Sequence, residues 1–132
     1  MAIQSAIQLA ELSEIFEKVG HWNFDIFRLS RTTHRPLVIL GHMLFTEMSL
    51  IDAVDEIKLI NFLCCIQTMY HESNEYHNAM HAADVTQTMF YFLTRSGMQC
   101  HLNRDTLTAV SIMPNTCVFL QVHSKIYNCR MI

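Results

Sequence analysis

The sequence has few of the residues that make turns and few that carry charge. Its 132 residues include only three glycines and two prolines, and 16% of the chain is charged, against about a quarter in typical soluble domains. A sheet of many short strands needs more turn residues than this, so the composition favours helices. Because 51% of the residues are hydrophobic, the chain suits a piece of a larger helical core better than a small self-contained domain.

Several other features are missing, and each absence excludes a class of protein. No apolar run reaches the roughly 18 residues of a transmembrane helix, and the acidic residues near the N-terminus do not fit a signal peptide. The net charge is −3, and no basic run is interleaved with aromatic residues, so the sequence lacks the basic pattern that is typical of nucleic-acid-binding proteins. The five cysteines form no CxxC pair. We expect a reduced, cytoplasmic chain that neither spans a membrane nor binds nucleic acid.

Apolar periodicity and helix-starting residues predict a succession of helices. The first is expected to end at Gly20, and residues 31–35 are expected to form a polar loop. The predicted helix starts carry residues that cap or suit a first turn, namely Pro36, Asp52 or Asp55, Asn78 and Asn103. The predicted helices cover about residues 7–19, 36–48, 52 or 55 to 70, 78–94 and 104–111. The sequence therefore predicts an all-α fold.

The last part of the sequence differs in character. Pro114 and Asn115 are predicted to break the helix. Residues 116–127 are rich in β-branched and aromatic side chains, which is typical of an extended tail or a weak strand. We therefore expect two parts: a helical part over residues 1–111 and a divergent tail over residues 112–132, disordered or extended.

The most informative run is Tyr-His-Asn-Ala-Met-His-Ala-Ala-Asp-Val at residues 76–85. His77 and His81 are four residues apart, and Asp84 follows three residues later, so a helix would place them on one side. Imidazole near neutral pH is both a metal ligand and a proton donor. Taken alone, an HxxxH pair is a weak signal. Without the glutamate of HExxH, a zinc-protease site has little support.

Neighbouring apolar residues have simpler explanations. Val85, Met89 and Phe92 recur at helical spacing, and we expect them to pack in a core rather than line a ligand pocket. Cys64 and Cys65 point in two directions from a helix, which favours core filling over a thiol site.

The whole run closely resembles the signature of class I 3′,5′-cyclic-nucleotide phosphodiesterases. Upstream and downstream, four further segments are similar to motifs of that family in the family's order: residues 19–27, 37–45, 62–70 and 105–110. The similarity covers about residues 10–110. It implies the N-terminal helical subdomain of the family's multi-helix catalytic fold.

The resemblance also implies a chemistry and roles for named residues. Family members hydrolyse cAMP or cGMP to the 5′-monophosphate in signal transduction, using two metal ions, typically zinc and magnesium, with manganese as a substitute. By resemblance, His77 is the general acid that protonates the leaving O3′, and His81 is the first ligand of the tighter metal. Tyr76 lines the substrate pocket. Asn78 is expected to cap the helix and orient the loop that bears His77, and Asp84 to have a local structural role.

The chain departs from the family pattern after residue 110. The family's helix continues into His-Asp and then His-Pro-Gly, whereas residues 110–115 read Val-Ser-Ile-Met-Pro-Asn and no His-Asp dipeptide occurs. A later aspartate ligand and the glutamine and aromatic residue that grip the purine are also missing. Catalytic zinc uses about three protein ligands, and no ligand set is recognisable in the spacing of the remaining candidates, His101, Cys117, His123 and Cys129.

We therefore expect a product truncated near residue 111, by an alternative exon, a frame change or an incomplete gene model. Such a chain is expected not to bind the metals stably and not to hydrolyse cyclic nucleotides alone.

Three functions stay open for the chain as it stands. The first is a phosphodiesterase by descent. The second is a non-catalytic or dominant-negative piece that binds a full-length phosphodiesterase, another helical protein or itself through exposed apolar faces of its third and fourth helices, with Phe62 and Leu63 in the contact. The same faces predict poor solubility. The third is a metal-buffering protein that uses its histidines and cysteines.

Overall fold

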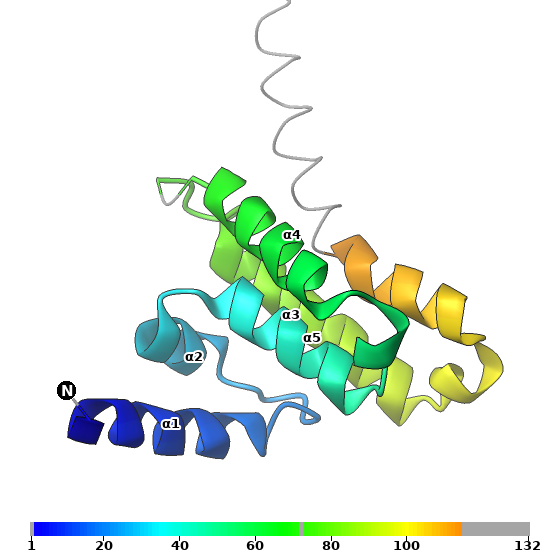
Figure 1. The fold of residues 1–132 in the computed structure, drawn as a ribbon, viewed down its shortest axis with the longest axis horizontal. Coiled ribbons are helices and arrows are strands. Elements are labelled where there is room, and N and C mark those ends of the chain that lie inside the picture. The colour runs from blue at the N-terminus through cyan, green and yellow to red at the C-terminus, as the bar shows by residue number, and fades with distance from the viewer. Residues whose placement is uncertain (1, 72, 115–132) are drawn as a thin grey trace, which may run out of the picture.

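The computed structural model describes residues 2–71 and 73–114, which fold as a set of packed helices (Figure 1). In chain order these are α1 (Ala2–Phe16), α2 (Ile26–Thr33), α3 (Pro36–Glu47), the short 3₁₀ helix η1 (Ile51–Ala53), α4 (Glu56–Met69), α5 (Ala79–Arg95), η2 (Met98–His101) and a last helix over residues 104–114. No strand occurs in these two ranges, which confirms the predicted all-α class. None of these helices is long and apolar enough to cross a lipid bilayer.

Helices begin where a side chain satisfies the free N–H groups of a first turn. Asp55, not Asp52, caps α4, and Asn103 caps the last helix; each carboxylate or amide oxygen accepts the backbone N–H three residues on, at 3.1 and 2.8 Å. Asn78 caps α5 in the same way. Pro36 occupies the first turn of α3, where its missing N–H costs nothing. These starts were predicted from the sequence and are confirmed.

The predicted polar loop over residues 31–35 is wrong, because most of it is helical. Asp25 caps α2 through a 2.9 Å hydrogen bond to the N–H three residues on. The hydroxyls of Thr32 and Thr33 donate to carbonyls one turn earlier, at 3.0 and 3.2 Å. These side chains bond to their own helix instead of competing with it. α2 ends at Thr33, and its C-cap, His34, takes the left-handed conformation with φ 53°.

Two predicted helix ends also differ from the structure. α1 ends at Phe16 and not near Gly20, because the amides of Lys18 and Val19 bond to carbonyls three residues back and tighten the chain into a turn. The last helix continues past Ser111 to residue 114. The predicted tail thus begins inside a helix, and from residue 115 onward it lies outside the described part of the chain.

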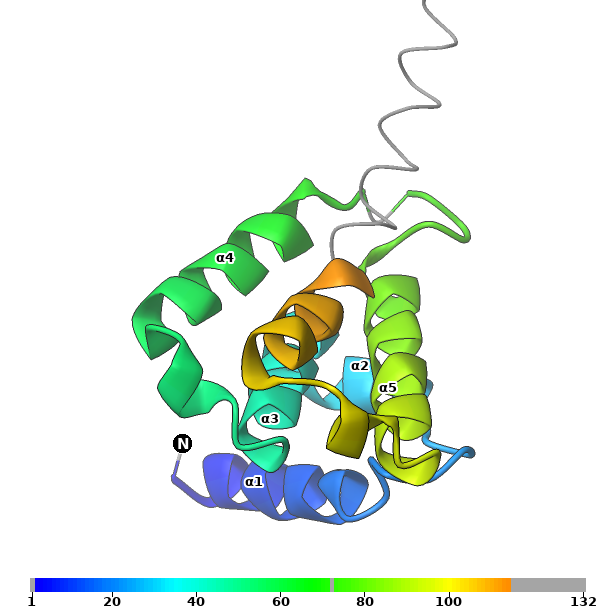
Figure 2. The same ribbon diagram turned by 90° about the vertical axis from the view of Figure 1, so that its right-hand side faces the viewer.

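α3 is the central helix and contacts α2, α4 and α5 (Figure 1). Figure 2 shows the last helix beside α3 and between α4 and α5. A Cβ on Gly41 would lie 3.0 Å from both δ-carbons of Leu63, so the glycine lets α4 pack close to α3. The buried residues of α3 cover most of its circumference: Pro36, Leu37, Val38, Leu40, Gly41, Leu44 and Phe45.

Two apolar clusters share α3. The first lies among α1, α2, α3, α5 and the C-terminal half of α4, and the second among α3, α4, α5 and the last helix. Leu63 is 1% exposed in the second cluster, so its predicted place on a contact surface is wrong. Val85 and Met89 pack against the clusters as predicted, whereas Phe92 is 49% exposed. Among the free cysteines of the described ranges, Cys64 packs against the second cluster and Cys65 is exposed.

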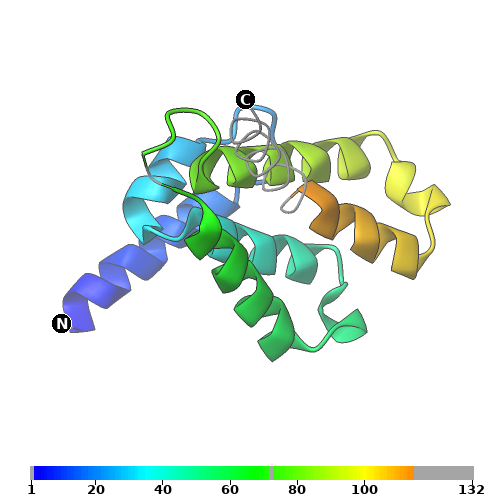
Figure 3. The same cartoon turned by 90° about the horizontal axis from the view of Figure 1, so that it is seen from above.

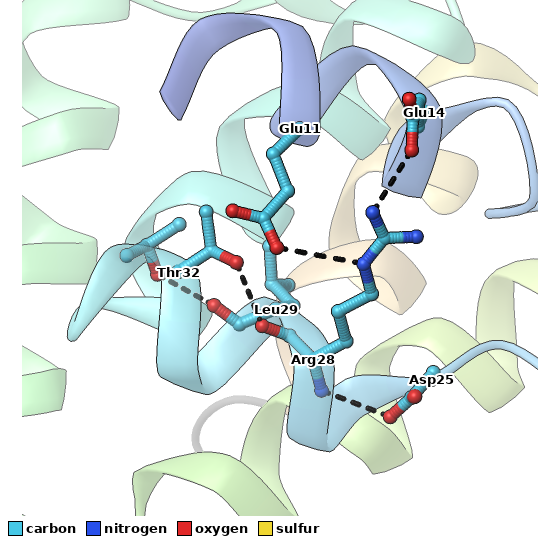
Figure 4. Close-up of polar contacts among 7 residues, drawn as sticks. Glu11, Glu14, Asp25, Arg28, Leu29 and Thr32 are labelled. Atoms are coloured by element: carbon cyan, nitrogen blue, oxygen red, sulfur yellow. Dashed lines mark hydrogen bonds and ion pairs between the residues drawn. The ribbon is translucent and has the colours of Figure 1, made fainter. Parts of the chain in front are cut away.

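α1 lies at one side of the molecule, and its N-terminal end extends away from the other helices (Figure 3). The Arg28 guanidinium on α2 reaches the carboxylates of Glu14 at 2.9 Å and Glu11 at 3.5 Å (Figure 4). These partly exposed ion pairs contribute little on their own. The buried side chain of Ile15, which is 3% exposed, anchors the C-terminal half of α1 in the first cluster.

Candidate functional site

Two asparagines fix the loop that leads into α5. Asn78 Oδ1 accepts the backbone N–H of His81 at 3.0 Å, and its Nδ2 donates to the carbonyl of Asn74 at 3.1 Å. Asn74 Nδ2 in turn donates to the carbonyl of His77 at 3.3 Å, and the Asn78 N–H donates to the carbonyl of Tyr76 at 3.0 Å. The predicted cap is therefore present, and the same side chain also ties down the loop that carries His77.

The rings of Tyr76, His77 and His81 lie against one another. Their centroids are 4.3 Å apart for Tyr76 and His81, 5.0 Å for Tyr76 and His77, and 5.9 Å for the two histidines. Tyr76 is 65% exposed, so the cluster opens to solvent on its tyrosine side. The structure thus brings together the three residues to which the sequence assigned chemistry.

A pocket of about 640 Å³ lies beside these rings. Residues 23–27, from the turn before α2 and the start of α2, form one wall. The opposite wall comes from the loop before α5 and from α5 itself: Glu75, Tyr76, Asn78, Met80, His81 and Asp84. Aromatic and aliphatic side chains with a few converging polar groups are the usual composition of a small-molecule site. His77 does not line the pocket but contacts two rings at its edge.

Burial lowers the pKa of His81 below its usual value of 6.5. A positive charge on His77 lowers it further, and the Asp84 carboxylate opposes both effects. His81 is therefore held in its neutral form near neutral pH, which is the form that a metal ion binds.

The turn of residues 19–21, which precedes the wall formed by residues 23–27, is bonded to α5. Gln87 Nε2 donates to the carbonyl of Val19 at 2.7 Å and to that of His21 at 3.0 Å, and Arg95 Nε donates to the carbonyl of Gly20 at 3.1 Å. The sequence had marked residues 19–27 and 76–85 as separate motifs. It gave no sign that a glutamine in α5, just after the second motif, bonds to the first motif.

Residues 76–114 match the family described as 3′5′-cyclic nucleotide phosphodiesterase. The chain carries part of a cyclic-nucleotide phosphodiesterase domain. The "High affinity cAMP-specific and IBMX-insensitive 3′,5′-cyclic phosphodiesterase 8A" of Homo sapiens is 38% identical over 87 residues, which are 64% of this chain and 10% of that protein. The "Probable 3′,5′-cyclic phosphodiesterase pde-6" of Caenorhabditis elegans is 32% identical over 103 residues, 76% of this chain and 14% of that protein.

The chain thus spans only about a tenth to a seventh of the length of these relatives. The family match begins at Tyr76, so it contains all five predicted site residues, and it continues to the end of the last described helix.

The described part of the chain does not fit a complete metal centre. Across residues 2–71 and 73–114, no group of three or more histidine, cysteine, aspartate or glutamate side chains lies close enough to hold a metal ion. A catalytic zinc site uses about three protein ligands. His101, one of the other predicted candidates, is exposed in η2. Cys117, His123 and Cys129 lie outside the described residues.

Proposed function

We propose that this chain supplies the proton donor and the first metal ligand of a 3′,5′-cyclic-nucleotide phosphodiesterase that acts on cAMP. The observation that carries the proposal is the contact of the Tyr76, His77 and His81 rings beside a pocket of about 640 Å³. The name of the human relative, a cAMP-specific phosphodiesterase, supports the choice of substrate.

In this proposal each residue has one task. His77, as imidazolium, donates its proton to the leaving O3′, because an alkoxide is too basic to leave unprotonated. His81, kept neutral by burial, is the first ligand of a divalent metal; zinc and magnesium, or manganese, would supply the attacking hydroxide when bound in a complete site. Tyr76 covers the bound nucleotide, Asn78 holds the loop, and Asp84 faces the same pocket as His81.

We propose further that a polypeptide of these 132 residues does not turn over cyclic nucleotides unaided. One histidine with one nearby carboxylate does not hold a catalytic metal against water. Since the described residues lack the remaining ligands, no metal-dependent step is assigned to them.

The first test is hydrolysis of cAMP and cGMP by the purified chain with magnesium and zinc, beside His77→Ala. Background turnover in both proteins is the expected result. Turnover that the substitution abolishes would show that these residues complete a site by themselves.

A chimaera tests the roles of the residues. Residues 10–110 would replace the matching segment of the human relative, and cAMP hydrolysis would be measured. The chimaera is expected to be active, and His77→Gln to lower kcat by about 10²- to 10⁴-fold, the usual contribution of a general acid. His71→Gln is the matched control, because His71 is an exposed histidine just before the same loop. Equal losses in the two variants would refute the role of His77.

The exposed apolar side chains favour a second candidate, a non-catalytic piece that binds a full-length phosphodiesterase. Ile57 on α4 is 72% exposed and Phe92 on α5 is 49% exposed, more than a helix that packs on one side needs to show. Capture of the full-length human relative, lost in Ile57→Lys or Phe92→Lys, would support this function. No capture at micromolar concentration, with light scattering that shows a monomer, would count against it.

A further inference from the structure

The turn before α2 is bound to α5 by side chains from the helix. Gln87 is 3% exposed, and its single amide nitrogen donates to two carbonyls, those of Val19 and His21. The Arg95 guanidinium, on the exposed side, donates to the carbonyl between them. Three successive carbonyls of this turn, residues 19–21, therefore accept hydrogen bonds from a helix that lies 66 to 75 residues later in the sequence.

The turn and the pocket are continuous in the chain. Residue 21 is followed directly by residues 22–27, and residues 23–27 form one wall of the pocket. Gln87 lies three residues after Asp84 on α5, so the two side chains are neighbours on the helix surface. α5 therefore carries part of the opposite wall, with His81 and Asp84, and also the amide that bonds to the turn next to the first wall.

We propose that Gln87 is a positioning residue of the pocket, whose buried amide holds residues 19–21 so that residues 23–27 stand opposite His81 and Asp84. This inference rests on the proposed function, which gives the pocket its ligand. A glutamine suits the task because a neutral amide offers two donors without the cost of burying a charge. The bond to Val19 is buried, so without the amide this carbonyl would lose its partner away from bulk water, at a cost in free energy.

The single tryptophan of the chain reports on this turn. Trp22 follows the tethered residues, and its ring makes edge contacts with Tyr91 at 5.4 Å and Phe92 at 6.0 Å, both on α5. Because the ring is 67% exposed, its near-ultraviolet circular dichroism, and not its emission maximum, depends on how the turn packs against α5.

Gln87→Met tests the proposal, because methionine keeps the length and volume of the side chain and removes both donors. Loss of the two hydrogen bonds is expected to speed amide exchange at Lys18, Val19 and His21, whose N–H groups bond within the turn, by roughly tenfold to a hundredfold. The near-ultraviolet circular dichroism of Trp22 is expected to weaken as its contacts with Tyr91 and Phe92 loosen. Amides of the last helix are expected to keep their exchange rates.

Gln67→Met is the matched control. Gln67 Oε1 accepts the N–H groups of Leu37 and Val38, at 3.1 and 3.2 Å, and so anchors the start of α3 instead of the pocket wall. It is expected to speed exchange at these two amides and to leave the turn and Trp22 unchanged. Uniform acceleration along the chain in Gln87→Met, or no change in the turn, would overturn the proposal.

A second measurement covers the case in which Gln87→Met does not fold. In the wild-type chain, the Nε2 protons of Gln87 are expected to exchange with solvent at least about tenfold more slowly than those of a glutamine in a short peptide. Exchange at the peptide rate would overturn the proposal without any variant.

Titration with cAMP, followed by NMR shifts of residues 23–27, separates this inference from the proposed function. If the wild-type chain binds, Gln87→Met is expected to weaken affinity about tenfold and Gln67→Met to leave it unchanged; equal affinity in all three proteins would refute the positioning role. If the wild-type chain does not bind cAMP, the pocket is not a cAMP site in this chain alone, and the exchange data decide whether Gln87 holds the wall.

Discussion

Asn78 has two separate tasks in the structure, and two substitutions tell them apart. Its Oδ1 caps α5 by accepting the N–H of His81, and its Nδ2 donates to the carbonyl of Asn74 in the loop that bears His77. Asn78→Ala removes both hydrogen bonds. Asn78→Asp keeps the capping acceptor, adds negative charge at the N-terminus of the helix, and removes only the donor.

The expected magnitudes follow from these contacts. Loss of a cap costs about 1 kcal/mol, and loss of a partly buried hydrogen bond costs about 1 kcal/mol more, so Asn78→Ala is expected to lower the free energy of unfolding by about 2 kcal/mol. In Asn78→Asp, the interaction of the carboxylate with the helix dipole, about 0.3–1 kcal/mol, offsets most of the lost donor. That variant is expected to stay within about 1 kcal/mol of the wild type.

Urea unfolding followed by circular dichroism gives both values, provided the m-value is the same in all three proteins. Asn103→Ala is the control, because Asn103 caps the last helix in the same way. It is expected to cost about 1 kcal/mol without faster amide exchange at Asn74 or Asn78. Equal losses in the alanine and aspartate variants of Asn78 would refute the reasoning, because they would show that the cap contributes nothing.

Three further predictions concern pH, packing and the attachment of α1. Because burial lowers the pKa of His81 below 6.5, the unfolded chain binds this proton more tightly. The contribution of His81 to the free energy of unfolding should be fully present above pH 6.5 and should be lost as the pH drops toward the folded pKa. Urea unfolding at about pH 5–7 should show a smaller loss of stability in His81→Gln than in the wild type. An unchanged dependence of the free energy of unfolding on pH would contradict this. Gly41→Ala is expected to lower the free energy of unfolding by about 1 kcal/mol, because overpacking against Leu63 outweighs the gain in helix propensity. Adding Leu63→Val to this variant should recover part of the lost stability. A single variant more stable than the wild type would contradict the prediction. Ile15→Ala is expected to cost about 2–5 kcal/mol in thermal unfolding, and Arg28→Met much less, with an effect that disappears in high salt; the reverse order would show that the ion pairs hold α1.

The helices and their starts were readable from the sequence because a cap is a local device. Asp55, Asn78 and Asn103 each bond to a backbone group three residues away, so the residue type and its place before an apolar run carry the information. The exception is α2. Its arginine and threonine side chains read as a loop, and only the bonds from Thr32 and Thr33 to the previous turn show that they sit on a helix.

The candidate site also has a part that was predictable from local sequence and a part that depends on tertiary packing. The sequence placed Tyr76, His77 and His81 together because they lie within six residues. It did not place residues 23–27 opposite them, since that contact closes a loop of about 50 residues and depends on how α2, α3 and α5 pack. The part played by Gln87 was equally hidden, because its partners lie 66 and 68 residues earlier in the chain.

The small side chains of Ala82 and Ala83 help to position the reactive residues on either side of them. His81 and Asp84 line the pocket, while Ala82 and Ala83 between them are 0% exposed in the first apolar cluster. A helix turns by about 100° per residue, so two adjacent small side chains let α5 press against the core there and leave the flanking residues on the open side. The rigid placement of His81 thus depends on side chains that carry no chemistry. This explains why the signature is informative as a whole string, whereas its two histidines alone are not.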